Sequence, residues 1–223
     1  MNKVWQNIPT MAFKRGLYDG NVSVRELREY GSFGVGEFDR LDGELVAKNG
    51  KFFRATADGR AQLADESAGV ALAIVSFFDP QIYYVVPQGL NFQTIQTFLG
   101  DKLPSRNSFY AFSIDGVFKS VSATAMIPQT KPFPPYDEVL KSSARDFEYR
   151  DVEGTMVAFY TPIFMNNIGI PGYHFHFLTA AETGGGHVTS FAVSEGRIAV
   201  ERIDHFLLSL PKGDDYGKAL LTS

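Results

Sequence analysis

Three of the chain's four histidines fall within one short stretch of sequence, YHFHFLTAAETGGGHV at 173–188. Successive side chains alternate across a β-strand, so His174 and His176 should point to one face while the aromatic residues around them point to the other. His187 follows a glycine-rich turn and begins the next strand-like run, so a hairpin would bring it alongside the first two. The spacing therefore predicts three imidazole groups facing a single point.

Such a group is typical of a metal site. Three histidines leave one coordination position open, as in catalytic zinc sites, and imidazole with oxygen donors suits Zn²⁺, with Fe²⁺, Mn²⁺ or Ni²⁺ also possible. The chain has no cysteine, which excludes thiolate ligands and a thiolate nucleophile. A chance cluster of core or surface histidines is the alternative interpretation. His205 lies apart, in an apolar-alternating run, and is interpreted as structural.

Composition limits the partners of the chain. Its 223 residues carry a net charge of −4, and its 21 basic residues are scattered, which argues against a nucleic-acid partner. The first residues lack the apolar run of a signal peptide. The longest apolar stretch, at 69–78, is shorter than the roughly 20 residues that cross a bilayer. We therefore expect a cytoplasmic protein with no membrane partner.

Local patterns predict a strand-rich α+β fold with two sheet layers and a few short helices. Asn-Gly and Asp-Gly pairs indicate turns of a meander within 36–63, at 49–50 and 58–59. Another Asp-Gly pair, Asp115-Gly116, predicts a hairpin within 109–128. Helices are expected at 21–31, with Ser23 as the N-cap, at 91–100 and at 134–147; further strands are expected at 68–79, 81–87, 154–164, 172–180 and 187–211.

A proline-rich stretch at 127–137 is the least regular segment and a candidate joint. It would separate an N-terminal β-rich half, 1–127, which carries Glu44, from a C-terminal half, 128–223, which carries the histidines. The two halves are expected to form one compact unit. The glycine-rich segments at 34–36 and 184–186 lack the surroundings of phosphate-binding loops and are interpreted as turns.

Several segments, in order along nearly the whole chain, carry a resemblance to a known family. They are LYDG at 17–20, FGVGEFDRLDGELV at 33–46, FYAFSIDGVFKSV at 109–121, KPFPP at 131–135, GTMVAFYTPIF at 154–164 and the histidine segment itself. With these segments the chain resembles the α-acetolactate decarboxylases. The resemblance implies a zinc enzyme that converts 2-hydroxy-2-methyl-3-oxobutanoate to acetoin and CO₂. It also implies an α+β fold with a sheet in each of two layers, and a homodimer.

The resemblance assigns roles to particular residues. It implies that His174, His176 and His187 are the metal ligands and that Glu44 is a carboxylate near the metal that handles protons or contributes to coordination. The chemistry agrees, because a 2-hydroxy-3-oxo acid can chelate a metal and the cation can stabilise the charge left after CO₂ departs. A neighbouring carboxyl group can then deliver a proton to carbon.

The chain also departs from the family pattern. Thr124 stands where the resemblance implies an arginine facing the substrate, and Ser190 stands where it implies an aspartate. The last residues, KGDDYGKALLTS at 212–223, hold no counterpart of the family's C-terminal glutamate. We therefore expect the second carboxylate of the site to be missing or replaced. Arg106 and Lys119 are the candidates to replace the arginine.

Three functions fit these observations. The first is metal-dependent decarboxylation of 2-acetolactate. The second is a catalytically silent or altered-specificity homologue that binds, or acts on, another hydroxy-oxo acid, which Thr124 favours. The third is a cupin-like dioxygenase or isomerase, since that class shares a His-x-His pair with a later histidine, and bound iron would indicate it.

Overall fold

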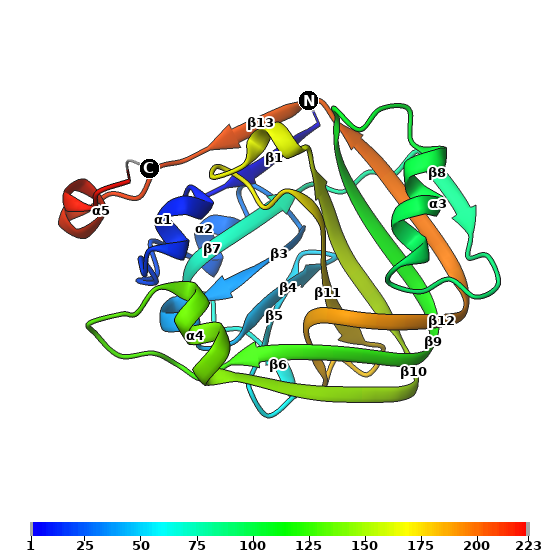
Figure 1. The fold of residues 1–223 in the computed structure, drawn as a ribbon, viewed down its shortest axis with the longest axis horizontal. Helices are drawn as coiled ribbons and strands as arrows, with labels where there is room; N and C mark the ends of the chain where they lie inside the picture. The colour runs from blue at the N-terminus through cyan, green and yellow to red at the C-terminus, as the bar shows by residue number, and fades with distance from the viewer. Residues whose placement is uncertain (1, 222–223) are drawn as a thin grey trace.

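Two β-sheets packed face to face make up most of the computed structural model, which describes residues 2–221 (Figure 1). The first sheet has the strand order β13-β1-β7-β3-β4-β5-β6, with β2 beside β7. Its strands are β1 (Lys3–Gln6), β2 (Val22–Ser23), β3 (Phe33–Phe38), β4 (Glu44–Lys48), β5 (Lys51–Ala55), β6 (Ala61–Leu63), β7 (Gly69–Ser76) and β13 (His205–Leu208).

The second sheet has the order β11-β10-β9-β12-β8, and β11 also pairs with the beginning of β12. Its strands are β8 (Ile82–Val85), β9 (Phe109–Met126), β10 (Ala144–Thr161), β11 (Gly172–Thr179) and β12 (Gly185–Ile203). Three of these strands are 18 or 19 residues long, and they curve around the end of the molecule as a broad arch (Figure 1).

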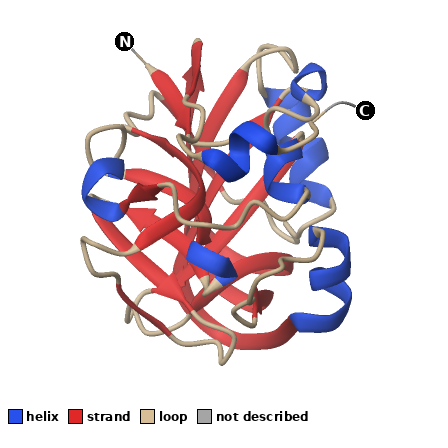
Figure 2. Cartoon of the chain, turned by 90° about the vertical axis from the view of Figure 1, so that its left-hand side faces the viewer, coloured by secondary structure: helices blue, strands red, loops and turns tan. Residues whose placement is uncertain are grey.

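Short helices lie at the periphery of the two sheets (Figure 2). The α-helices are α1 (Thr10–Lys14), α2 (Val24–Leu27), α3 (Thr94–Lys102), α4 (Tyr136–Ser143) and α5 (Asp214–Lys218), and the 3₁₀ turns are η1 (Asp39–Leu41) and η2 (Ile163–Met165). The prediction of a strand-rich α+β fold with two sheet layers is confirmed. None of the helices in the described part of the chain is long and apolar enough to span a membrane.

The core is layered like the sheets. Side chains from the inner faces of both sheets meet in one apolar cluster, which includes Val35, Val46, Val157 and Leu178. The outer face of the second sheet packs against α3, and the outer face of the first packs against α2. Each sheet is therefore apolar on both faces, with one face covered by the other sheet and one by a helix.

Local turn chemistry explains much of the first sheet. Ser23 caps α2 through a reciprocal capping box with Glu26, as the sequence predicts. Asn49 and Gly50 both adopt positive φ and join β4 to β5 in the predicted meander.

The predicted hairpin at Asp115-Gly116 is wrong, because β9 runs through this pair without turning. Gly116 lies between Gly154 of β10 and Gly196 of β12, and a Cβ atom on it would lie 2.2 Å from the carbonyl oxygen of Glu195. The glycine permits close approach of neighbouring strands rather than a turn. Likewise, the segment after His187 forms one long strand, β12, before the short β13.

The interpretation of residues 34–36 as a turn is also wrong. These residues lie within β3, and a Cβ atom on Gly36 would come 2.0 Å from the carbonyl oxygen of Leu72 on β7. The two sheets also do not divide the chain at residue 127. Strand β9, which precedes it, belongs to the second sheet, whereas β13, near the C-terminus, pairs with β1 in the first.

Candidate metal centre

Strand β11 presents two different faces. Its residues Phe175 and Phe177 pack in the cluster under α3, whereas Leu178 belongs to the cluster between the sheets. His174 and His176 are both buried, and their Nε2 atoms lie 3.1 Å apart. The alternation of the strand therefore places both imidazoles on the same side, as the sequence predicts.

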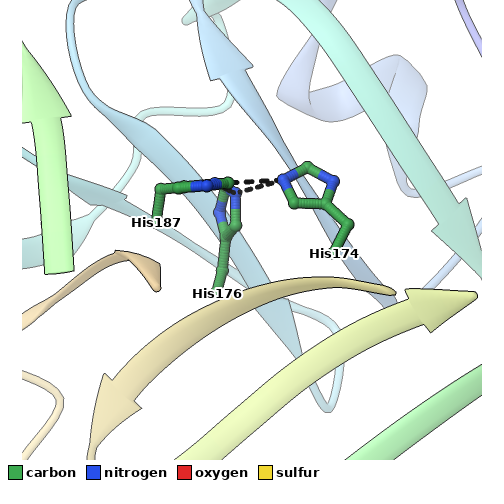
Figure 3. A group of neighbouring side chains, drawn as sticks. All are labelled: His174, His176 and His187. Carbon is green, nitrogen blue, oxygen red and sulfur yellow. Dashed lines mark hydrogen bonds between the residues drawn. The ribbon is translucent and has the colours of Figure 1, made fainter. Parts of the chain in front are cut away.

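His187 joins them from β12. It lies directly opposite His176 in the β11–β12 pairing, and its Nδ1 atom is 3.1 Å from Nε2 of His174 and 3.3 Å from Nε2 of His176. Figure 3 shows the three rings turned toward a common point. The Gly184–Gly186 segment, of which Gly185 and Gly186 already belong to β12, forms the short return that brings the third histidine back alongside the first two.

This spacing fits a metal ion. Nitrogen ligands about 2.0–2.1 Å from a tetrahedral zinc ion lie about 3.3 Å from one another, close to the distances observed here. Nδ1 of His176 lies 2.9 Å from the backbone carbonyl oxygen of Leu45, so it carries the proton and donates it, which leaves the lone pair of Nε2 facing the other two rings. The donor set is therefore arranged as that of a divalent metal would be.

Burial keeps these imidazoles neutral. Desolvation lowers the pKa of His174 and His176 well below the usual histidine value, and the neighbouring rings lower them further. Burial also lowers the pKa of His187 to about 4. Neutral imidazole is the form that binds metal. The Nδ1 atom of His174 is buried without a hydrogen-bond partner among the described residues.

Glu44 begins β4 and reaches the cluster from the opposite sheet. Its Oε2 atom lies 3.4 Å from Nε2 of His176, and its side chain is fully buried. Burial raises the pKa of Glu44 well above its usual range, and the facing carboxyl group of Glu37 raises it further. The structure thus brings together all four residues that the sequence singled out.

The histidines line a cavity of about 300 Å³. Its floor comes from both sheets and its cover from α1 and α4. The lining residues are Thr10, Phe13, Lys14, Gly36, Glu37, Leu72, Thr124, Tyr136, Leu140, Ile170, His174, His176, His187 and Thr189. A cavity of this size, with few polar groups and one group of ligating nitrogens, is suited to a small molecule.

Thr124 of β9 lies in this wall, directly opposite His187 of β12. Its hydroxyl donates a hydrogen bond to the carbonyl oxygen of Arg145. The candidates to replace the missing arginine, Arg106 and Lys119, are absent from the described wall of the cavity. The basic side chain there is Lys14, at the end of α1. His205 is exposed at the beginning of β13, in agreement with its exclusion from the site, and Ser190 is exposed and outside the cavity wall.

Sequence reasoning missed the two charged residues of the described cavity wall, Lys14 and Glu37. For Glu37 a signal was present, since it alternates with Phe33 and Val35 and so must share their buried face. For Lys14 no comparable signal exists, because α1 has five residues and no side-chain cap.

Comparison with known proteins decides the family. The family model of α-acetolactate decarboxylase matches residues 4–223. The chain belongs to this family. It is 35% identical to the α-acetolactate decarboxylase of Methylococcus capsulatus over 95% of this chain and 81% of that one. It is 33% identical to the enzyme of the same name from Bacillus licheniformis, over 98% of this chain and 86% of that one.

The fold agrees with this membership. The crystal structure of α-acetolactate decarboxylase from Bacillus subtilis superposes with a TM-score of 0.96 at 32% identity, covering 99% of this chain and 94% of that one. The resemblance to this family of carboxy-lyases is therefore confirmed.

Proposed function

We propose that the protein decarboxylates 2-acetolactate to acetoin and CO₂, with a divalent metal, Zn²⁺ by the donor set, held by His174, His176 and His187. One observation carries the proposal. In a chain of the α-acetolactate decarboxylase family, three neutral imidazoles converge at metal-ligand spacing in the wall of a small cavity.

A bound divalent cation would supply positive charge for the hydroxyl and carbonyl oxygens of the substrate and for the negative charge left when CO₂ departs. The chain's own residues do the rest. The Leu45 carbonyl holds the ring of His176 in orientation. Glu44, fully buried beside that ring, is the carboxyl group that would handle protons next to the metal ligands.

The position of Lys14 is consistent with a negatively charged substrate. It is exposed at its place in the cavity wall, and among the described residues it makes no hydrogen bond or ion pair. We propose that its ammonium group attracts the carboxylate of the substrate, in place of the arginine that Thr124 replaces. An ammonium group on a flexible stem acts as a point charge rather than as a bidentate clamp.

The test is acetoin formation from racemic acetolactate by the zinc-loaded protein, compared with the same preparation after chelation. We expect CO₂ and acetoin in equal amounts, loss of activity on chelation, and recovery when zinc is restored. A protein that holds one equivalent of zinc and makes no acetoin would contradict the proposal. Screening other 2-hydroxy-3-oxo acids would then decide between altered specificity and a binding role.

Assembly and location follow the resemblance. We propose a cytoplasmic homodimer whose two sequence halves, 1–127 and 128–223, act as one unit. Light scattering of the purified protein tests the dimer, and a mass of about 25 kDa, that of one chain, would contradict it.

A further inference from the structure

A second buried carboxyl group lies beside Glu44. Glu37 of β3 stands directly opposite Glu44 of β4, on the face that Phe33 and Val35 share between the sheets. The side chain of Glu37 is 6% exposed, and its Oε2 atom has no hydrogen-bond partner among the described residues. Leaving a buried carboxyl oxygen without a partner costs stability, so its retention requires an explanation.

The two carboxyl groups differ in what they face. Glu37 lines the histidine cavity, whereas Glu44 is fully buried and is absent from its described wall. In that wall Glu37 is the acidic side chain. A molecule in the cavity would therefore meet the carboxyl group of Glu37 directly.

The surroundings of Glu37 favour its protonated form. Burial raises its pKa to about 8, and the adjacent carboxyl group of Glu44 opposes part of that rise. Two neighbouring buried carboxyl groups disfavour a second negative charge, which favours the protonated form of one of them. The other titratable groups around this place include Tyr136 on α4, whose pKa rises well above its usual value through burial and both carboxylates, and Tyr18, whose pKa is raised by burial and by Glu37. Lys14 on α1 and the three histidines on β11 and β12 share the cavity wall.

We propose that Glu37 is a second catalytic carboxyl group: it faces the substrate in the histidine cavity, stands opposite Glu44 on the neighbouring strand, and donates the proton that takes the place of CO₂. This inference rests on the proposed decarboxylation. It places a second carboxyl group, from the first sheet, in the wall of the histidine cavity.

The proton balance is simple. The bond between the carboxylate carbon and the hydroxyl-bearing carbon breaks, its electron pair stays on the hydroxyl-bearing carbon, and CO₂ leaves. A new C–H bond forms there with the proton from Glu37, and the resulting carboxylate of Glu37 takes one proton from solvent. Each turnover consumes one proton and converts one acetolactate anion to acetoin and CO₂.

The experiment compares Glu37→Gln with the wild type, both loaded with zinc. Glutamine keeps the shape and removes the acid, so we expect unchanged zinc content, KM within about threefold, and kcat lower by about 100-fold or more. The pH dependence of kcat should lose its basic limb. Glu138→Gln, which changes an exposed carboxylate on α4, is the matched control and should behave as wild type.

A spectroscopic experiment tests the role of Glu37 independently of turnover. Infrared difference spectra of the zinc-loaded protein with 2-hydroxy-2-methylbutanoate should show a protonated carboxyl band that shifts on binding and is missing in Glu37→Gln. If the wild type shows the shift but makes no acetoin, the decarboxylase proposal fails and the contact of Glu37 with an acid ligand stands.

Two results overturn the role of Glu37. One is a Glu37→Gln variant with kcat within threefold of wild type and an unchanged pH profile. The other is a carboxyl band identical in both proteins. Should Glu37→Gln fail to fold or to load zinc, Glu37→Asp carries the test. It keeps the acid but withdraws it by one methylene, and kcat between that of wild type and inactive protein is expected; full activity in Glu37→Asp would also contradict the proposal.

Discussion

The layer between the two sheets has an apolar part and a polar part, and the same strands supply both. Val35 and Val46 pack against the second sheet in the apolar part. Two residues after Val35 stands Glu37, and two residues before Val46 stands Glu44, next to the histidines. In this polar part, buried atoms have no hydrogen-bond partner among the residues that the structure describes: Glu37 Oε2, both carboxyl oxygens of Glu44, and His174 Nδ1. The apolar part stabilises the fold. The polar part lowers the stability of the fold, because buried polar atoms without partners are unfavourable, and it holds the groups of the proposed site.

The largest expected effect comes from removing a ligand in the polar part. His176→Ala should abolish zinc binding and lower acetoin formation by at least about 1,000-fold, which corresponds to about 4 kcal/mol. Metal analysis and an activity assay measure both. His205→Ala, at an exposed position on β13, should change neither. Equal zinc content in the two variants would contradict the assignment of His176.

The apolar part should respond in the opposite way. Phe33, 4% exposed, stacks on Phe78 and packs against Phe159 between the sheets. Phe33→Ala should lower the free energy of unfolding by about 3–5 kcal/mol through lost burial and a cavity. Urea denaturation measures this loss, and the protein that remains folded should bind zinc normally. A loss of zinc affinity without loss of stability would show that the two parts are not separable.

The pH dependence of stability sharpens the contrast further. In metal-free protein, Glu37 is ionised when unfolded, with a pKa of about 4.3, but its folded pKa is about 8. Stability should therefore fall as pH rises through this interval. The histidines, whose folded pKa values are lowered, destabilise the fold only below about pH 6.5.

Between pH 6.5 and 8 the carboxyl effect is thus isolated. Over this window the metal-free wild type should lose up to about 2 kcal/mol, and Glu37→Gln should lose less. Thermal melts in the two buffers, with chelator present, make the measurement. A wild type whose stability is flat or rises across this window would contradict a raised pKa at Glu37.

The smallest effect concerns the mouth of the cavity. Lys14→Met should raise KM for acetolactate about tenfold, about 1.4 kcal/mol, with a smaller change in kcat, because it removes a charge that attracts the substrate before reaction. Added salt should weaken the wild type's affinity more than the variant's. Lys141→Met, at an exposed position on α4 and outside the cavity wall, is the control, and an equal effect there would contradict a specific role.

Sequence reasoning succeeded where a local rule coincided with the final environment. Alternation along β11 placed His174 and His176 together, and the Asn49-Gly50 turn set the meander. It failed at Asp115-Gly116, because partners on both sides, about 40 and 80 residues away, hold β9 straight through a good turn sequence. No local rule states which strand will lie beside a glycine.

The site itself shows the same limit. The histidines are close together in the sequence, so their spacing predicts a common site. Glu37 and Lys14 instead come from β3 and from a five-residue helix, α1. The alternation of Phe33, Val35 and Glu37 contained the burial of the glutamate. Its position opposite Glu44 follows from the register set by η1 and the turn at Gly43, which only the folded chain displays.

The hydrogen bond between His176 and the Leu45 carbonyl joins a ring of the second sheet to the backbone of the first. The second sheet alone can gather the three rings, but the proton of His176 is assigned only once the first sheet has docked. The affinity for the metal should therefore depend on the relative position of the two sheets. Consider a substitution far from the cavity that shifts one sheet relative to the other by a fraction of an ångström. It should weaken the affinity for zinc before it lowers the helix or strand content.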